Sequence, residues 1–462
     1  MEYGPWSLLV DAGLIGTLLL LGTLVRRWVG LAQRLMLPAS VIAGFLGLAL
    51  GPEVLGLLPF SDQLGTYASV LIAVIFACLA LSDDMGLKGF GRGTAAFSSY
   101  SMAMYTLQVG LGMLFALLLF VPVFGTPDGF GLLLFAGWAG GFGSAAAVGT
   151  VFGDAGWVEA SSLAFTSATV GLLIGIIGGI AWAHWGARRG HAPRLGAPAD
   201  MPESLRSGLV RDPAERASIG TATTSASAIE PLGLQLGLVV AVSAAAYGLG
   251  EASSALFTSF SPPTFVLAFL IGLVVKGVLR RTPAWAYTDA RTIKSISGVS
   301  TDVLIVCGIA SIVPSFVADY WVPLVILFVV GLALCLAMVR WVAPRVMHGA
   351  WFEKAVFTWG WATGAVATSI ALLRIVDPDL DSRTLEEFGL AYLPVAPVET
   401  ASVALTPLIV IAGAGWAVAS GWTAVGLVAL ALPFLLGWTR ARPAPTPTPP
   451  SRSTADTSEE HR

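Results

Sequence analysis

Long apolar stretches, each close to the length that crosses a lipid bilayer, dominate the sequence of this chain. A helix rises about 1.5 Å per residue and the hydrocarbon core is about 30 Å thick, so about 20 apolar residues span it. Apolar side chains make up 56% of the 462 residues and charged ones 11%, against roughly 25% charged residues in soluble domains. The composition predicts an all-α, multi-pass membrane protein surrounded by lipid, and it excludes nucleic acid as a partner.

Eleven stretches are apolar enough to be membrane spans. They are residues 6–25, 38–58, 66–82, 98–121, 160–185, 230–250, 262–279, 296–314, 321–343, 388–411 and 419–438. Two more apolar stretches, 131–153 and 352–373, are unusually rich in Gly, Ala, Ser and Thr.

A polar segment, residues 186–228, divides the chain into two halves, 1–185 and 229–415. An additional span lies within 416–439, and a Pro-, Thr- and Ser-rich tail occupies 440–462. The polar segment and the tail carry too little apolar surface to fold alone, so we expect a disordered linker and a disordered tail.

The basic residues indicate how the spans are oriented, because Lys and Arg resist translocation and collect on the cytoplasmic side. If the N-terminus is outside and both small-residue stretches enter the membrane and return, all 25 Lys and Arg residues fall on the cytoplasmic side. If both stretches crossed fully, the basic clusters would be split between the two sides. The charges therefore predict two re-entrant segments and a cytoplasmic C-terminus in an inner membrane.

Five spans before a cytoplasmic linker require the second half to enter the membrane in the opposite direction. The segment that begins at Pro38 aligns with the one at Pro263 at an offset of 225 residues, and Gly143 aligns with Gly364 at an offset of 221. We therefore expect two inverted repeats of five spans, each with a re-entrant Gly-rich loop between its fourth and fifth spans. Interrupted helices at equivalent positions of two halves are typical of a central binding site in transporters.

The two predicted loops contain the first candidate residues. Non-helical backbone at membrane depth needs protein or a water-filled cavity to satisfy its polar groups. Bare N–H groups in the first loop could face an anion, whereas hydroxyls and freed carbonyls in the second suit Na⁺. The alternative is close helix packing through small residues. The candidates are Gly140, Gly141, Phe142, Gly143 and Ser144 in the first loop and Gly360, Thr363, Gly364, Thr368 and Ser369 in the second.

Glu399 lies inside the predicted span 388–411, where an acid costs about 3 kcal/mol. Neighbouring prolines would interrupt the helix and free carbonyls, so Glu399, Thr400 and Ser402 could bind a cation or exchange a proton. The alternative is a structural acid that is hydrogen-bonded to another helix.

Other polar residues in or near the spans have simpler interpretations. Asp302 and Arg374 are weaker candidates. An interfacial position explains Asp302, and a role in the cytoplasmic loop explains Arg374. The guanidinium of Arg374 could also pair with an anionic substrate. Asp11, Gln108 and Asp154 are interpreted as membrane-edge or helix-contact residues. The spacing of Cys and His residues predicts neither a resident metal nor a cofactor, and any Na⁺ is cargo.

This pattern resembles the bacterial sodium/glutamate symporter family over most of residues 6–415. The resemblance rests on the Pro38 and Pro263 segments, on Gly140 to Ser144 with the alanines that follow, and on Thr363 to Ala371. The family's first loop usually reads Gly-Gly-His-Gly-Thr, so Phe142 replaces a histidine and Ser144 a threonine.

Three further departures from the family lie after residue 350. Trp359 and Trp361 stand where smaller residues are usual, and Glu399 precedes the position of the family's aspartate in that span. The span 419–438 is additional to the usual ten.

The resemblance implies Na⁺-coupled uptake of glutamate or a related small organic anion by alternating access, in a homodimer of the bacterial cytoplasmic membrane. A cation/proton antiporter coupled to H⁺, or a carrier of another organic anion, is the alternative, and a channel is a third. We expect no enzymatic activity, because no serine or aspartate in the spans has a catalytic context.

Overall fold

The computed structural model describes residues 4–35, 37–82, 91–192, 203, 207–256, 263–364, 366–378 and 380–439. Much of the predicted linker, residues 193–202 and 204–206, and the predicted tail, 440–462, lie outside the described residues. The described part of the chain contains only helices, turns and irregular segments, as the composition predicts.

The chain forms its helices in two series. The first series is α1 (Pro5–Trp28), α2 (Gly30–Arg34), α3 (Ala39–Leu50), α4 (Leu64–Ser82), α5 (Arg92–Phe115) with its π-helical continuation η1 (Ala116–Phe124), η2 (Asp128–Gly131), α6 (Leu132–Gly137), α7 (Gly141–Asp154) and α8 (Ala160–Arg188). The second is η3 (Pro213–Glu215), α10 (Pro231–Leu256), α11 (Thr264–Leu279), η4 (Pro283–Tyr287), α12 (Ala290–Ala310), α13 (Pro314–Asp319), α14 (Trp321–Ala337), the π-helical η5 (Met338–Val342), α15 (Ala343–Val346), α16 (Trp351–Thr363), α17 (Val366–Val376), α18 (Thr384–Tyr392), α19 (Val395–Ile411) and α20 (Gly415–Leu435).

Eight helices of the described chain are long and apolar enough to cross a membrane, or nine if α18 and α19, bent by 53°, count as one span. The sequence predicts eleven, and the difference lies in the two short helices α3 and α11 and in this bent pair. α3 ends before Pro52, where the N–H groups of Leu57 and Leu58 turn back to donate to the carbonyl of Leu50. The chain is thus multi-pass, but three of the predicted spans are shorter or less straight than expected.

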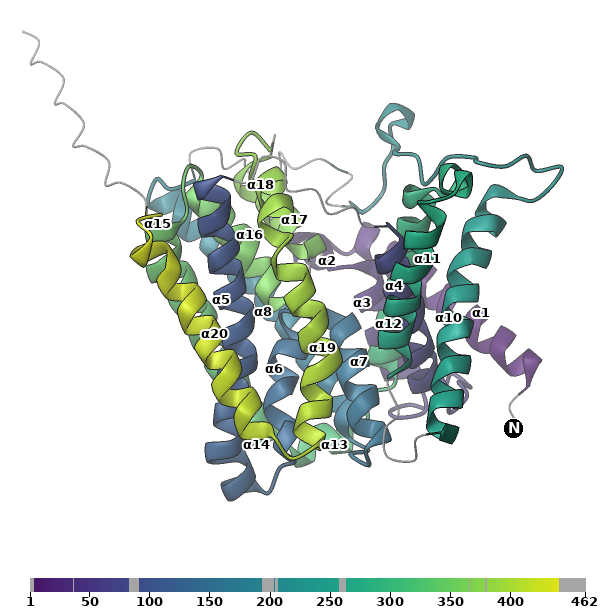
Figure 1. Cartoon of the computed structure of the whole chain (residues 1–462), viewed down its shortest axis with the longest axis horizontal. Helices are drawn as coiled ribbons and strands as arrows, with labels where there is room; N and C mark the ends of the chain where they lie inside the picture. Colours follow the sequence, from purple (N-terminus) through teal and green to yellow (C-terminus); the bar gives the residue numbers. More distant parts are fainter. Residues whose placement is uncertain are drawn as a thin grey trace, which may run out of the picture.

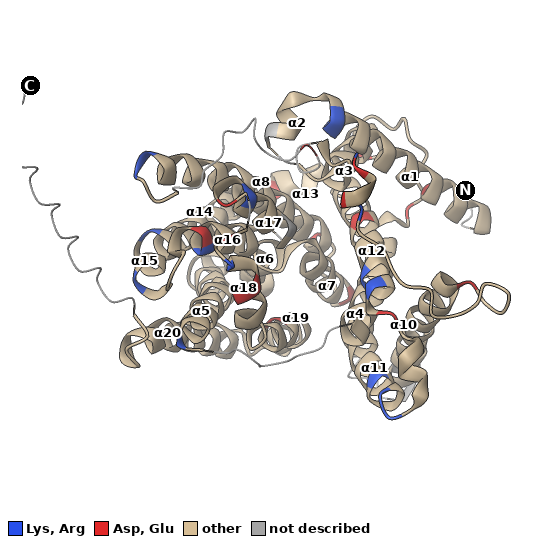
Figure 2. Cartoon of the chain, turned by 90° about the horizontal axis from the view of Figure 1, so that it is seen from above, with Lys and Arg blue, Asp and Glu red and all other residues tan. Residues whose placement is uncertain are grey.

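Two helical bundles lie side by side (Figures 1 and 2). The site bundle contains α5 to α8 and α14 to α20, and the flanking bundle contains α1 to α4 and α10 to α12. α7 and α8 form the boundary, because they pack against α4 and α12. A hydrogen bond of 2.8 Å joins the hydroxyls of Ser69 on α4 and Thr150 on α7 across this boundary.

The additional helix α20 packs lengthwise on α5 within the site bundle. A side chain at Gly110 of α5 would collide with Thr423, and one at Gly426 of α20 would lie 2.6 Å from Leu107. Small residues therefore let the two helices approach closely, and α20 also contacts α19.

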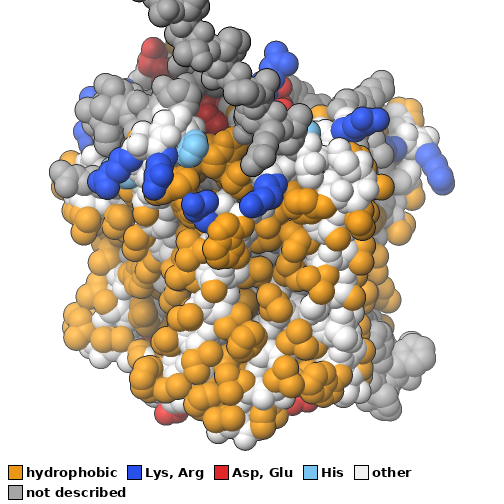
Figure 3. Space-filling model, turned by 90° about the vertical axis from the view of Figure 1, so that its left-hand side faces the viewer, with side chains coloured by type: hydrophobic (Ala, Val, Ile, Leu, Met, Phe, Trp, Pro, Cys, Tyr) orange, Lys and Arg blue, Asp and Glu red, His pale blue; other side chains and the backbone are white. Residues whose placement is uncertain are grey.

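The surface of the site bundle is a broad apolar belt, and Lys and Arg side chains gather at one end of it (Figure 3). Arg26 and Arg27 lie in the last turn of α1, and Arg188 in the last turn of α8. We call this end of the molecule the basic end. Such an apolar belt fits a bilayer's hydrocarbon layer, with the basic end at one membrane surface.

Several structural features recur in the two halves. Pro38 and Pro263 are the N-caps of α3 and α11 and have almost the same backbone angles, φ −57° and ψ 140° against φ −56° and ψ 136°. The π-helical segments η1 and η5 begin 222 residues apart, and the prolines Pro122 and Pro344 follow at the same separation. Each π-helical segment lies near the end of the long helix that precedes an interrupted helix pair, η1 at the end of α5 and η5 between α14 and α15.

Candidate functional site: two interrupted helices that meet

The first interruption separates α6 from α7 at residues 138–140. Gly141, the first residue of α7, has φ +65°, a left-handed conformation that costs other residues about 1–2 kcal/mol. A Cβ atom at Gly141 would also lie only 2.8 Å from the carbonyl oxygen of Gly364. Glycine is therefore required here both for the turn and for the close approach of another backbone.

The second interruption separates α16 from α17 just after Thr363, and two glycines of α8 hold it in place. A Cβ at Gly171 would lie 2.6 Å from the carbonyl of Thr363, and one at Gly175 would lie 2.7 Å from its hydroxyl. Thr363 is fully buried, and its hydroxyl donates to the carbonyl of Trp359 at 2.7 Å. The small residues of α8 thus act in helix packing.

The two interruptions meet where Gly141 approaches the carbonyl of Gly364; α7 begins at Gly141, whereas Gly364 caps the end of α16 and α17 begins two residues later, at Val366. The first N–H groups of a helix have no acceptor within it, and they carry a partial positive charge. The N-cap residue of α7 is Gly140, which has no side chain with which to cap the helix. The arrangement can therefore bind an anion such as a carboxylate through backbone groups.

The other predicted loop residues line the same region. The side chains of Phe142, Ser144 and Thr368 are buried but not completely, with 8%, 7% and 7% exposure, and Ser144 covers Gly140. A Cβ at Gly360 would lie 2.9 Å from the Cα of Ser369, so α16 and α17 pack directly on each other.

Glu399 on α19 belongs to a cluster of aromatic residues beside the second interruption. The hydroxyl of Tyr392 donates to its carboxylate, and the hydroxyl of Tyr105 donates to its backbone carbonyl at 3.4 Å. Trp361 stacks on Tyr105 with ring centroids 6.4 Å apart and contacts Tyr392 at 5.9 Å. We call Tyr105, Trp361, Tyr392 and Glu399 the acid cluster. Because Trp361 is two residues before Thr363, α16 links the cluster to the interruption.

Thr400 and Ser402 follow Glu399 on the same helix. Their hydroxyls donate to the carbonyls of Ala396 and Val398 of α19, at 3.0 Å and 2.7 Å. These bonds use the hydroxyl protons and leave the oxygen lone pairs as the only groups that could contact a cation.

Gln108 is a residue of the site that sequence reasoning interpreted only as a helix contact. Its side chain is completely buried on α5, and its Nε2 donates to the carbonyl of Ala362 at 2.8 Å, beside the second interruption. Its Oε1 has no hydrogen-bond partner among the described residues. The sequence feature that could have identified Gln108 was a side-chain amide within an apolar span. Tyr105, which the sequence analysis did not single out, lies three residues earlier on the same helical face.

The weaker candidates lie elsewhere. Asp302 is exposed on α12, a helix of the flanking bundle, so the structure does not bring it to the acid cluster. Arg374 is in the last turn of α17. Nearby Asp377 accepts hydrogen bonds from the backbone N–H groups of Asp381 at 3.2 Å and Ser382 at 2.9 Å, which orders the following loop.

Asp11 makes a helix contact, as its sequence position suggests. Its carboxylate accepts hydrogen bonds from Ser61 and, at 2.6 Å, from the hydroxyl of Tyr67, and it is almost completely buried. These bonds tie α1 to the segment that precedes α4 and to α4 itself.

A family profile described as sodium/glutamate symporter matches residues 9–378. The matched part includes both interruptions and Gln108, but it ends before α18, so Glu399 and α20 lie beyond it. A search among curated proteins found no match to the chain.

Proposed function

The chain belongs to the sodium/glutamate symporter family, and from this premise we propose that it couples the entry of Na⁺ to the uptake of glutamate or a related small organic anion. The family makes the chain a multi-pass membrane transporter rather than an enzyme, with Na⁺ as coupling ion. The observation that carries the specific proposal is the close approach of the N-terminus of α7, at Gly141, to the Gly364 carbonyl at the end of α16, two residues before α17 begins. Backbone N–H groups at such a point favour the carboxylate of an amino acid.

We propose that both interrupted pairs are re-entrant and belong to inverted repeats. α6, α7, α16 and α17 have 6, 14, 13 and 11 residues, each too short to cross the bilayer. A Cβ atom at Gly360 of α16 would lie 3.1 Å from the side chain of Leu372 of α17, so α17 runs back alongside α16 as in a helical hairpin. The matched prolines and π-helical segments of the two halves support the repeat, and the basic end is then the cytoplasmic side.

The second interruption and the acid cluster supply the chemistry for a cation. Carbonyls at the C-terminal end of α16 carry partial negative charge, and the carboxylate of Glu399 adds a formal one. An anion at the helix N-termini and a Na⁺ beside these oxygens would each stabilise the other. This mutual stabilisation would couple the two solutes.

Alternating access would then move the site bundle against the flanking bundle, with the contacts of α7 and α8 with α4 and α12 as the sliding surface. We propose that the flanking bundle stays fixed in a homodimer of the bacterial cytoplasmic membrane.

Proton coupling is the second candidate, and Glu399 is the observation that favours it. An acid in a span that accepts a hydrogen bond from Tyr392 can exchange a proton as well as bind Na⁺. A cation/proton antiporter or a carrier of another organic anion would use the same cluster.

Uptake into proteoliposomes tests these proposals. The purified chain is reconstituted, and the uptake of radiolabelled glutamate, aspartate and other organic anions is measured under an inward Na⁺ gradient, a proton gradient or neither. We expect concentrative uptake of glutamate or a close relative only with Na⁺. Accumulation driven by protons alone would favour the second candidate, and unitary currents in a planar bilayer would favour a channel.

A further inference from the structure

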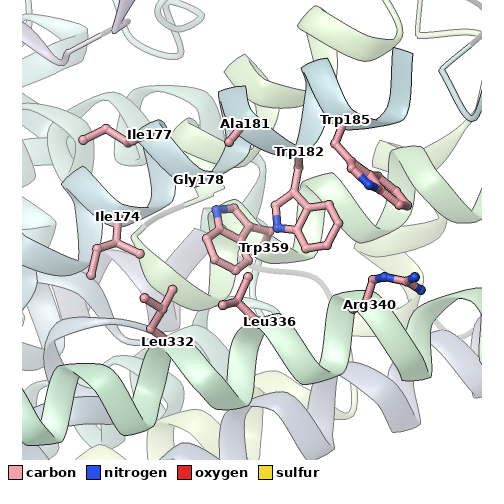
Figure 4. Close-up of a pocket in the computed structure, with 10 residues that line it drawn as sticks. All are labelled: Ile174, Ile177, Gly178, Ala181, Trp182, Trp185, Leu332, Leu336, Arg340 and Trp359. Atoms are coloured by element: carbon pink, nitrogen blue, oxygen red, sulfur yellow. The ribbon is translucent and has the colours of Figure 1, made fainter. Parts of the chain in front are cut away.

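A groove that the transport proposal does not use runs between α8 and α14 on the outer face of the site bundle. Its volume is about 520 Å³, within the range of roughly 300–1,000 Å³ that small-molecule sites occupy. Ile177 and Leu336 line it and are 58% and 40% exposed. Figure 4 shows isoleucines and leucines along most of the groove, with tryptophans and Arg340 toward its other end.

The polar end of the groove lies at the basic end of the molecule. Trp185 lies three residues before Arg188, in the last turn of α8, and packs edge-on against Trp182 at 5.2 Å. The guanidinium of Arg340 lies over the ring of Trp185, 5.6 Å from its centroid. Arg340 is exposed and has no carboxylate partner among the described residues. Tryptophans mark the level of lipid headgroups, where their apolar bodies and polar N–H groups are both satisfied.

We propose that this groove binds one anionic phospholipid, with an acyl chain along Ile177, Leu332 and Leu336 and the phosphodiester on Arg340. The charge decides the class of lipid, because an unpaired guanidinium at a membrane surface binds a phosphate bidentately. A zwitterionic lipid carries the same phosphodiester together with a quaternary ammonium, so its net charge is zero and it is attracted less strongly to the arginines of the basic end. The two tryptophans cover the glycerol region between these ends.

The groove is connected to the interrupted helices. Trp359 of α16 forms part of its wall, and its indole N–H donates to the carbonyl of Gly175 at 2.9 Å. Gly178 lies against the same ring, and a Cβ there would collide with it. A lipid in the groove therefore packs directly on the helix that ends at Thr363.

Native mass spectrometry of the full-length chain in detergent tests the proposal. Phosphatidylglycerol and phosphatidylcholine with the same acyl chains are titrated in turn, and the first binding event is quantified. We expect Arg340→Gln to weaken phosphatidylglycerol binding about fivefold, the equivalent of about 1 kcal/mol for one basic residue at a membrane surface, and to weaken phosphatidylcholine binding less. Ala181→Leu, which fills the groove from an exposed position on its wall, is expected to weaken binding of both lipids.

Arg345→Gln is the matched control, because Arg345 is also exposed on the following turn but does not line the groove. Equal loss in Arg340→Gln and Arg345→Gln would show general attraction and overturn the proposal, as would unchanged binding in Arg340→Gln. Displacement by glycerol phosphate alone would show a free-phosphate site instead and would also overturn it. Thermal melts identify any variant that fails to fold. The readout is binding, so its result is independent of whether the chain transports glutamate.

Discussion

The two helix interruptions differ in what surrounds them. Between α6 and α7 the chain offers backbone, with Gly140 and Gly141 at the turn and Ser144 folded over it. Between α16 and α17 the turn is surrounded by side chains, including Gln108 on a carbonyl and the acid cluster one turn away. Bare N–H groups suit an anion, whereas oxygens and a carboxylate suit a cation. On this difference we base the proposal that the two solutes bind on opposite sides of one meeting point.

Gly141→Ala should have the largest effect, because it damages the contact that both interruptions share. Alanine at φ +65° costs about 1–2 kcal/mol, and its Cβ would push the carbonyl of Gly364 away. We expect Na⁺-driven uptake to fall by about a hundredfold or more, since small displacements of binding groups have effects of this size. Gly153→Ala on the same helix has open space around it and should transport normally. Normal uptake by both variants would mean that the meeting point is not the site.

Glu399→Gln should impair the binding of the coupling cation and leave the binding of glutamate intact. We expect gradient-driven uptake to be abolished while expression and glutamate exchange persist, because the amide keeps the shape of the side chain but loses its charge. Uptake under opposed Na⁺ and proton gradients is the measurement. Full Na⁺-driven accumulation by this variant would remove Glu399 from the site.

Gln108→Leu should have a smaller effect, confined to the second interruption. Leucine fills a similar volume but leaves the carbonyl of Ala362 without its donor, which costs about 1–3 kcal/mol in a buried site. We expect the Na⁺ concentration for half-maximal uptake to change by about five- to tenfold, with a lower melting temperature. Ser420→Ala on the exposed face of α20 serves as the control. A change in glutamate affinity at saturating Na⁺, without a change for Na⁺, would reverse the assignment of the two interruptions.

The sequence singled out the two stretches, 131–153 and 352–373, within which the helices are interrupted, because glycines there allow turns that other residues avoid. That these stretches are re-entrant stays a prediction. The sequence did not predict that Tyr105 and Gln108 would join the second interruption to Glu399. Those contacts connect residues that are more than 250 positions apart in the chain, and no local pattern encodes them. The lengths of α3 and α11 were also not predicted, since hydropathy reports how apolar a stretch is and not where its backbone turns.

Glu399 shows another limit of local reasoning. The free-energy cost of placing its carboxylate in a membrane span can be predicted from the sequence. Its hydrogen-bond partner Tyr392, however, belongs to a separate helix, α18, whose axis is bent by 53° from that of α19. The prolines of this region predicted a broken helix but not which side chain the break would bring to the carboxylate.

Calorimetric titration of the purified chain tests most directly the claim that both solutes share one site. Glutamate affinity is measured with and without Na⁺, and Na⁺ affinity with and without glutamate, in the same buffer. If the interruptions form one coupled site, Na⁺ must increase glutamate affinity by the same factor by which glutamate increases Na⁺ affinity, and Glu399→Gln must bring that factor close to one. Glutamate that binds equally well in the presence and absence of Na⁺ would contradict the account.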